Sequence, residues 1–67
     1  MISIEEAKRE VERIKDIASD DEAAHGAEDD LWERALRTIA DGRADDPQHL
    51  ALVALETKKI DFQRWCA

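Results

Sequence analysis

The chain has 67 residues and a formal net charge of −7, and 40% of its residues are charged. A chain of this length forms one small domain with a thin core, and its acidity disfavours direct binding to the phosphate backbone of nucleic acids. No stretch reaches the roughly 20 apolar residues of a membrane span, and the first residues lack the basic start and apolar run of a signal peptide, so we expect a cytoplasmic protein.

The composition favours helix, because only two glycines and one proline are present. We therefore expect an all-α fold, a three-helix bundle with a short C-terminal helical turn, formed by residues 1–67 as a single domain. The one cysteine, Cys66, excludes a disulfide within the chain and fits a reducing compartment. A disulfide between two copies is an alternative, but a free terminal thiol is the simpler interpretation.

The first helix is predicted over residues 4–18. Ser3 and Glu6 have the spacing of a capping box, in which each residue satisfies the backbone N–H of the other. Apolar residues then recur every three or four positions and form one stripe: Ile4, Ala7, Val11, Ile14 and Ala18, with Ile17 beside them.

The second helix is predicted from about Asp21 to Asp41, after a cap at one of residues 19–21. Gly26 leaves two interpretations, either a continuous helix or a loop followed by a helix that starts near Ala27. The continuous helix is favoured because the apolar spacing runs through Gly26 along Ala24, Ala27, Leu31, Ala35 and Thr38 or Ile39. A glycine on that stripe would also let another helix approach closely, and Gly42 is suited to end the helix.

Asp46 and Pro47 predict the start of the third helix, over residues 47–57. Its apolar surface is broad and comprises Leu50, Ala51, Val53, Ala54 and Leu55. In the tail that follows, Asp61 can cap a short turn that places Phe62 and Trp65 on one side. We expect this tail to fold back on the bundle, although the two aromatic residues can also be interpreted as anchors for a partner.

The negative charge is concentrated in residues 20–30, which hold six acids and no base. A solubilising face is the simplest interpretation, and a patch that binds a basic protein surface is the alternative. Trp32 is interpreted either as a residue at the margin of the core or as an exposed anchor for a partner. The candidate partner-binding residues are Asp20, Asp21, Glu22, His25, Glu28, Asp29, Asp30 and Trp32.

Glu22 and His25 have the Glu-x-x-His spacing of di-iron bundles. Such a site needs a second element of this kind and further carboxylates, so a solvated acidic face is the favoured interpretation. Cys66 has no histidine nearby in the sequence, and no glycine-rich phosphate loop is evident. A domain this small also lacks room for a pocket of a few hundred Å³. We therefore expect no catalytic residue, no metal site, no cofactor and no enzymatic activity.

Residues 20–25, 28–31, 39–42 and 60–67, taken together, resemble small uncharacterised helical proteins of actinobacteria and their phages. The similarity covers most of the chain, and the ending is its most specific part. The resemblance brings no catalytic residue and no activity. It implies a phage or mobile-element context, in which short acidic helical proteins often act by binding a host protein.

The sequence thus predicts a non-enzymatic interaction module that binds a basic protein surface through an acidic helix. Such a surface could belong to a nucleic-acid-binding protein that the module inhibits. The alternative is a structural homodimer, because a thin core can be completed across a two-fold interface. A metal-binding helical protein is the third and weakest hypothesis.

Overall fold

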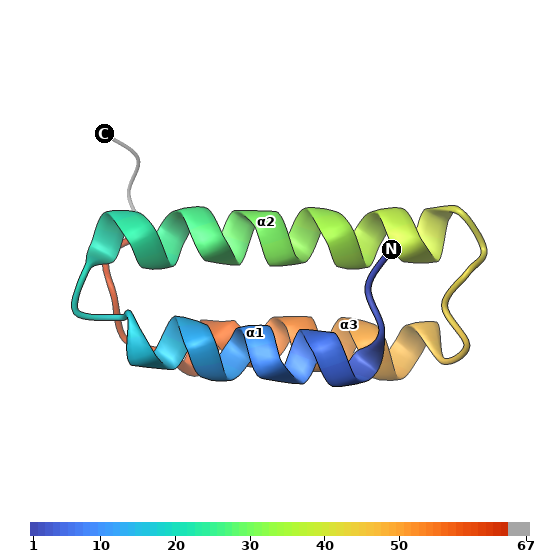
Figure 1. Ribbon diagram of the computed structural model, residues 1–67, viewed down its shortest axis with the longest axis horizontal. Coiled ribbons are helices and arrows are strands. Elements are labelled where there is room, and N and C mark those ends of the chain that lie inside the picture. Colours follow the sequence, from blue (N-terminus) through green and yellow to red (C-terminus); the bar gives the residue numbers. More distant parts are fainter. Residues whose placement is uncertain (65–67) are drawn as a thin grey trace.

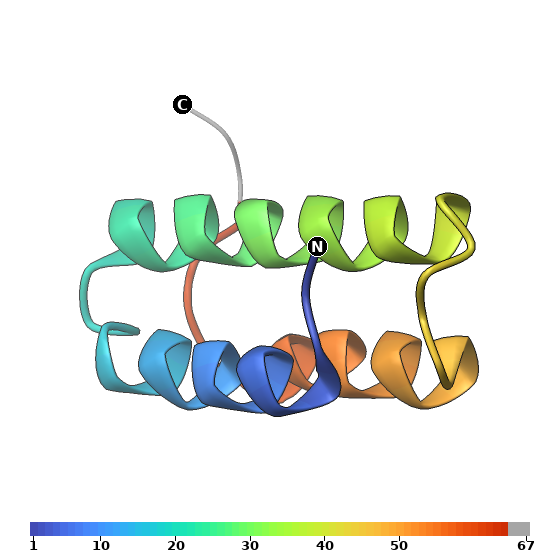
Figure 2. The same cartoon turned by 45° about the vertical axis from the view of Figure 1, so that its right-hand side comes forward.

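Three helices form the fold of this chain, of which the computed structural model describes residues 1–64. They are α1 (Ile4–Asp16), α2 (Asp21–Ala40) and α3 (Pro47–Leu55), and a short 3-10 helix, η1 (Glu56–Lys59), follows α3. α2 lies on one side of the molecule and runs antiparallel to α1 and α3, which lie together on the other side (Figures 1 and 2). The predicted all-α three-helix bundle is confirmed.

Each α-helix begins at a side chain that accepts a hydrogen bond from a free backbone N–H. Ser3 and Glu6 form the predicted capping box, with both side chain-to-backbone distances at 3.1 Å. Asp20 caps α2 by accepting from the N–H of Ala23 at 3.2 Å. Asp46 caps α3 at 3.0 Å from the N–H of His49. Local sequence therefore determines where all three helices begin.

The helix ends differ slightly from the prediction. α1 ends at Asp16, two residues before the predicted Ala18, and α3 gives way to η1 after Leu55. α2 ends at a glycine motif, because Gly42 adopts a φ of 70°. There the N–H of Arg43 donates to the carbonyl of Thr38 at 3.0 Å, which satisfies an acceptor at the helix end.

Gly26 lies inside α2, so the continuous-helix interpretation is correct. The expectation that this glycine lies on the buried stripe is wrong. Gly26 is exposed, and a Cβ built there would have no neighbouring atom within 4 Å. The reason is helical phase: the buried residues Ala24 and Leu31 place the apolar stripe on the other side of the helix.

The core lies between the three helices and contains residues from all of them. Its largest fully buried side chains are Ile14, Leu31 and Leu50, one from each helix, with Thr38 and Thr57 beside them. The predicted stripes of α1 and α2 are confirmed as the faces that pack inward. α3 contributes Leu50, Val53 and Ala54, whereas Leu52 and Leu55 remain exposed.

Two chain segments cross from the α1 and α3 side to α2, one from each end of the described chain (Figure 1). In the first, Ile2 is buried and its N–H donates to the Thr38 hydroxyl at 3.0 Å. In the second, Ile60 and Phe62 are buried, so the predicted folding-back of the tail is confirmed for this part.

The helical turn near the C-terminus is η1 at Glu56–Lys59, earlier than the turn predicted at Asp61. Residues 61–64 carry no helix, because the chain here spans from η1 to α2. The expectations for Trp65 and Cys66 lie outside the described residues.

Candidate functional site

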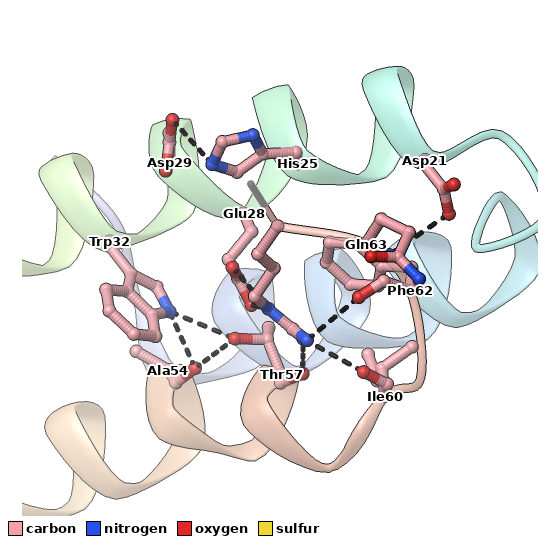
Figure 3. A network of polar contacts seen from close by, with 11 residues as sticks. Asp21, His25, Glu28, Asp29, Trp32, Ala54, Thr57, Ile60, Phe62 and Gln63 are labelled. Carbon is pink, nitrogen blue, oxygen red and sulfur yellow. Dashed lines mark hydrogen bonds and ion pairs between the residues drawn. The ribbon is translucent and has the colours of Figure 1, made fainter. Parts of the chain in front are cut away.

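The acidic stretch does not form one uniform surface, because Glu28 lies in the interior. Glu28 is 4% exposed, and its Oε1 accepts a hydrogen bond from the Nε of Arg64 at 2.9 Å. Figure 3 shows Glu28 directed toward Thr57, whereas His25 and Asp29 lie on another side of α2. The expectation that Glu28 belongs to an accessible acidic patch is therefore wrong.

Arg64 connects the C-terminal segment to the rest of the fold. Its Nη2 donates to the carbonyls of Thr57 at 2.6 Å and Ile60 at 2.9 Å, and its Nη1 donates to Phe62 at 3.3 Å. The guanidinium also lies 3.9 Å from the centre of the Phe62 ring. Because Arg64 donates to Glu28 and also to the carbonyls of Thr57, Ile60 and Phe62, it fixes this segment against α2.

The charge of Glu28 is retained in this interior. Burial raises the pKa of the Glu28 carboxyl. The hydrogen bond and charge of Arg64, together with the hydrogen bond of the nearby Thr57 hydroxyl, lower this pKa by more than burial raises it. The net effect is a Glu28 pKa below its ordinary value. The ionised carboxylate is thus the stable form at neutral pH, as expected for a buried acid with a cationic partner.

Trp32 is a half-buried side chain that connects α2 with the end of α3. Its indole Nε1 donates to the carbonyl of Ala54 and to the Thr57 hydroxyl, both at 3.0 Å, as Figure 3 shows. The Nζ of Lys58 lies 5.8 Å from the ring centre. Trp32 therefore lies at the margin of the core, as one of the two interpretations expected: its indole N–H is bonded within the fold, and part of its ring remains accessible.

Two further acids of the stretch have local structural roles. Asp20 caps α2, as described above. The Oδ1 of Asp21 accepts from the N–H of Gln63 at 3.2 Å, which fixes the C-terminal segment to the first turn of α2. Together with Glu28, half of the six acids thus hold the fold together.

The three remaining acids of the stretch and Glu33 form a surface that we call the α2 acidic face, comprising Glu22, Asp29, Asp30 and Glu33. All four are exposed, and their spacing places them on the side of α2 away from Leu31. Two of them have ion-pair partners on α2, Asp30 with Arg34 at 3.8 Å and Glu33 with Arg37 at 2.9 Å, and Asp29 lies 3.5 Å from the Nε2 of His25. Such exposed pairs are weak, so these carboxylates are available to a partner.

An apolar side chain lies next to the α2 acidic face. Leu36 is 64% exposed and lines a shallow groove together with Trp32, Ala40 and charged residues of the face. A leucine with this exposure lies largely outside the core. The groove therefore offers apolar contact beside negative charge, as the polar rim and apolar centre of an interface do.

The weakest hypothesis concerns a metal site at Glu22 and His25. Within residues 1–64, no three side chains of His, Cys, Asp or Glu gather closely enough to hold a metal ion. His25 instead contacts Asp29. No helix in the described part of the chain is long and apolar enough to cross a membrane.

Sequence reasoning missed Glu33, Leu36 and Arg64. Glu33 lies four residues after Asp29, so helical spacing alone extends the acidic face past residue 30. Leu36 lies off the predicted stripe of Leu31 and Ala35, which indicates exposure. Arg64 carries no local signal, because its partner Glu28 is 36 residues away in the sequence.

Comparison with known proteins gives no relative for this chain: no family model matches, and neither a curated protein nor a solved structure is similar to it. The function is therefore inferred from the geometry described above.

Proposed function

We propose that this protein is a non-enzymatic interaction module that binds a basic protein surface through the α2 acidic face. The observation that carries the proposal is the division of charge on α2. Four exposed carboxylates and Leu36 occupy the outer side of this helix, where neither α1 nor α3 covers them. Clustered carboxylates beside an apolar side chain suit a partner that presents Lys or Arg around an apolar residue.

Gly26 supports this proposal. It is exposed, and Glu22 and Asp30 lie four residues to either side, so it lies within the acidic face. A glycine inside a helix costs about 1 kcal/mol relative to alanine, and Gly26 makes no packing contact that offsets this cost. A partner that approaches the backbone of α2 closely gives this glycine a role.

The same chemistry defines the class of partner. A row of carboxylates along a helix attracts surfaces that bind phosphate backbones, since both ligands are anionic and spaced along a line. The proposed partner is therefore a basic protein, and a nucleic-acid-binding protein fits if the module blocks its binding site. The phage or mobile-element context implied by the resemblance is part of this proposal, with a host protein as the target.

The test is a pull-down from a host-type lysate, with washes at low and then high salt. The wild-type protein is compared with a variant that carries Asp29→Lys and Asp30→Lys. We expect one basic protein to be retained by the wild type at low salt, and to be lost at high salt and with the variant. The two substitutions remove only exposed pairs, so the melting temperature should change little.

A matched control reverses two exposed acids on α1, Glu5→Lys and Asp16→Lys, which changes the net charge equally. Retention of the partner by this control shows that the face, and not the total charge, determines binding. If both variants lose the partner equally, or if the α2 variant still retains it, the proposed face is incorrect.

A further inference from the structure

α3 exposes apolar side chains that the bundle does not use. Leu52 is 60% exposed and Leu55 is 52% exposed, and their spacing of three places them on the same side of the helix. Leu52 also lines a shallow groove between α1 and α3, together with Val11, Val53 and charged side chains at its rim. A helix that is apolar on most of its surface is normally covered on all sides. The outer side of α3 therefore lacks a covering element.

Charge around α3 is arranged asymmetrically along its axis. Asp45 and Asp46 lie at its N-terminal end. Glu56, Lys58 and Lys59 follow its C-terminal end in η1, where Lys59 pairs with Glu56 at 3.1 Å and the net charge is positive. All five side chains are exposed. Leu52 lies midway between Asp45 and Lys59 in the sequence. A second α3 that runs antiparallel about Leu52 brings the acids of each copy to the lysines of the other, whereas a parallel arrangement places like charges together.

We propose that two copies of this chain associate through the outer side of α3, antiparallel about a two-fold axis near Leu52. In this arrangement Leu52 contacts Leu52 of the second copy, and Asp45 of each copy lies near Lys59 of the other. The interface is self-complementary, as two-fold symmetry requires. The inference goes beyond the proposed function, because it uses neither α2 nor its acidic face.

An interface formed by one short helix is expected to give a weak dimer. An interface on a small protein covers about 10% of its surface, and a tenth of the 4660 Å² here is roughly 470 Å² per copy. The total of about 900 Å² belongs to the range of weak and transient complexes. We therefore expect reversible association in the micromolar range.

Dimerisation through α3 leaves both acidic faces free. α2 lies on the opposite side of the bundle from α1 and α3 (Figure 2), so two copies joined at α3 present two separate acidic faces. A partner with two basic sites, or two partner molecules on one scaffold, then binds with increased avidity.

The first test is sedimentation equilibrium of the full chain across micromolar to millimolar concentrations. We expect the wild type to shift from one to two chains, and Leu52→Glu to raise the dissociation constant at least about tenfold, because it buries two carboxylates against each other. Leu36→Glu is the matched control, since Leu36 is an equally exposed leucine on α2. Circular dichroism of each variant checks that the helices remain.

A second test addresses the orientation. Asp45→Lys and Lys59→Glu each place like charges at the proposed contact, so each variant alone should associate more weakly than the wild type. An equimolar mixture of the two variants forms a heterodimer with opposite charges at both contacts, which should restore the association. A wild type that stays monomeric at millimolar concentration overturns the proposal. So does equal weakening by Leu36→Glu, or a mixture that associates no better than its components.

Discussion

Glu28 and Asp29 are neighbours in the sequence, yet they belong to different regions of the molecule. The side chain of Glu28 is 5% exposed and that of Asp29 is 70% exposed. Glu28 lies four residues after Ala24 and three before Leu31, so it occupies a position on the apolar stripe of α2. Asp29 is rotated away from that stripe. The role of an acid in this stretch is therefore set by helical phase and not by local charge density.

The two regions also differ in what an ion pair contributes. On the α2 acidic face, a carboxylate that loses its partner is solvated by water, so such pairs contribute at most about 1 kcal/mol. In the interior, an acid that loses its partner remains as an uncompensated buried charge, at a cost of about 3–5 kcal/mol. Of these ion pairs, the interior one therefore contributes most to holding the C-terminal segment on α2.

The largest expected effect comes from Arg64→Ala. This change leaves Glu28 buried without its cation, and it removes the Arg64 donor from the carbonyls of Ile60 and Thr57, of which the second still accepts from the N–H of Ile60. We expect the free energy of unfolding to fall by about 3–5 kcal/mol. A domain of 67 residues has only roughly 3–10 kcal/mol of stability, so the variant should be partly unfolded. Urea denaturation followed by circular dichroism measures the loss.

Arg37→Ala is the control, because Arg37 pairs with Glu33 at the same distance of 2.9 Å but on the exposed side of α2. We expect this variant to lose less than about 1 kcal/mol. Comparable losses for the two arginine variants would contradict the distinction between the interior pair and the exposed pairs.

The decrease of stability at acid pH should also depend on the interior acid Glu28. Because the folded pKa of Glu28 lies below its ordinary value, its contribution to stability is complete above that ordinary value. The contribution is lost as the pH falls through the folded pKa. Glu28→Gln should therefore lower stability at neutral pH and make its decrease toward acid pH less steep. Urea denaturation at a series of pH values measures both effects.

The pKa of a second acid, Glu6, is also lowered in the folded protein. The Glu28→Gln variant therefore needs a comparison. The hydrogen bonds with the backbone and hydroxyl of Ser3 lower the pKa of Glu6 in the capping box. Glu6→Gln is this comparison, because it removes the shifted acid of the capping box and leaves Glu28 in place. A slope in Glu28→Gln equal to that of the wild type would show that Glu28 does not carry the dependence.

Most of the fold could be predicted from the sequence, because its signals are local. Ser3, Asp46 and Gly42 mark helix ends through their own side chain or backbone preferences, and the stripes of α1 and α2 follow from a periodicity of three to four residues. The position of the C-terminal turn could not be predicted, since it depends on where the segment crosses to α2. That crossing is set by contacts such as Gln63 with Asp21, 42 residues apart.

The candidate site was predictable only in part. Glu22, Asp29 and Asp30 were identified from charge density, and their exposure agrees with that prediction. Glu28 was misassigned because the stretch was treated as one run, although its position between Ala24 and Leu31 indicates the buried stripe. The hydrogen bonds of Trp32 could not be foreseen, because Ala54 and Thr57 reach it only after α3 has packed against α2.

The smallest expected effects are those of alanine substitutions at the two glycines, and they have opposite signs. Gly26→Ala should stabilise the protein by about 1 kcal/mol, because alanine favours helix and its Cβ meets no atom within 4 Å. Gly42→Ala should destabilise it by about 1–2 kcal/mol, since its φ of 70° is unfavourable for a residue with a Cβ. Thermal denaturation measures both signs. If Gly26→Ala stabilises the fold and also weakens retention of the partner, the glycine is retained for close approach to α2. If it stabilises the fold and leaves retention unchanged, the partner contacts the carboxylates without approaching the helix backbone.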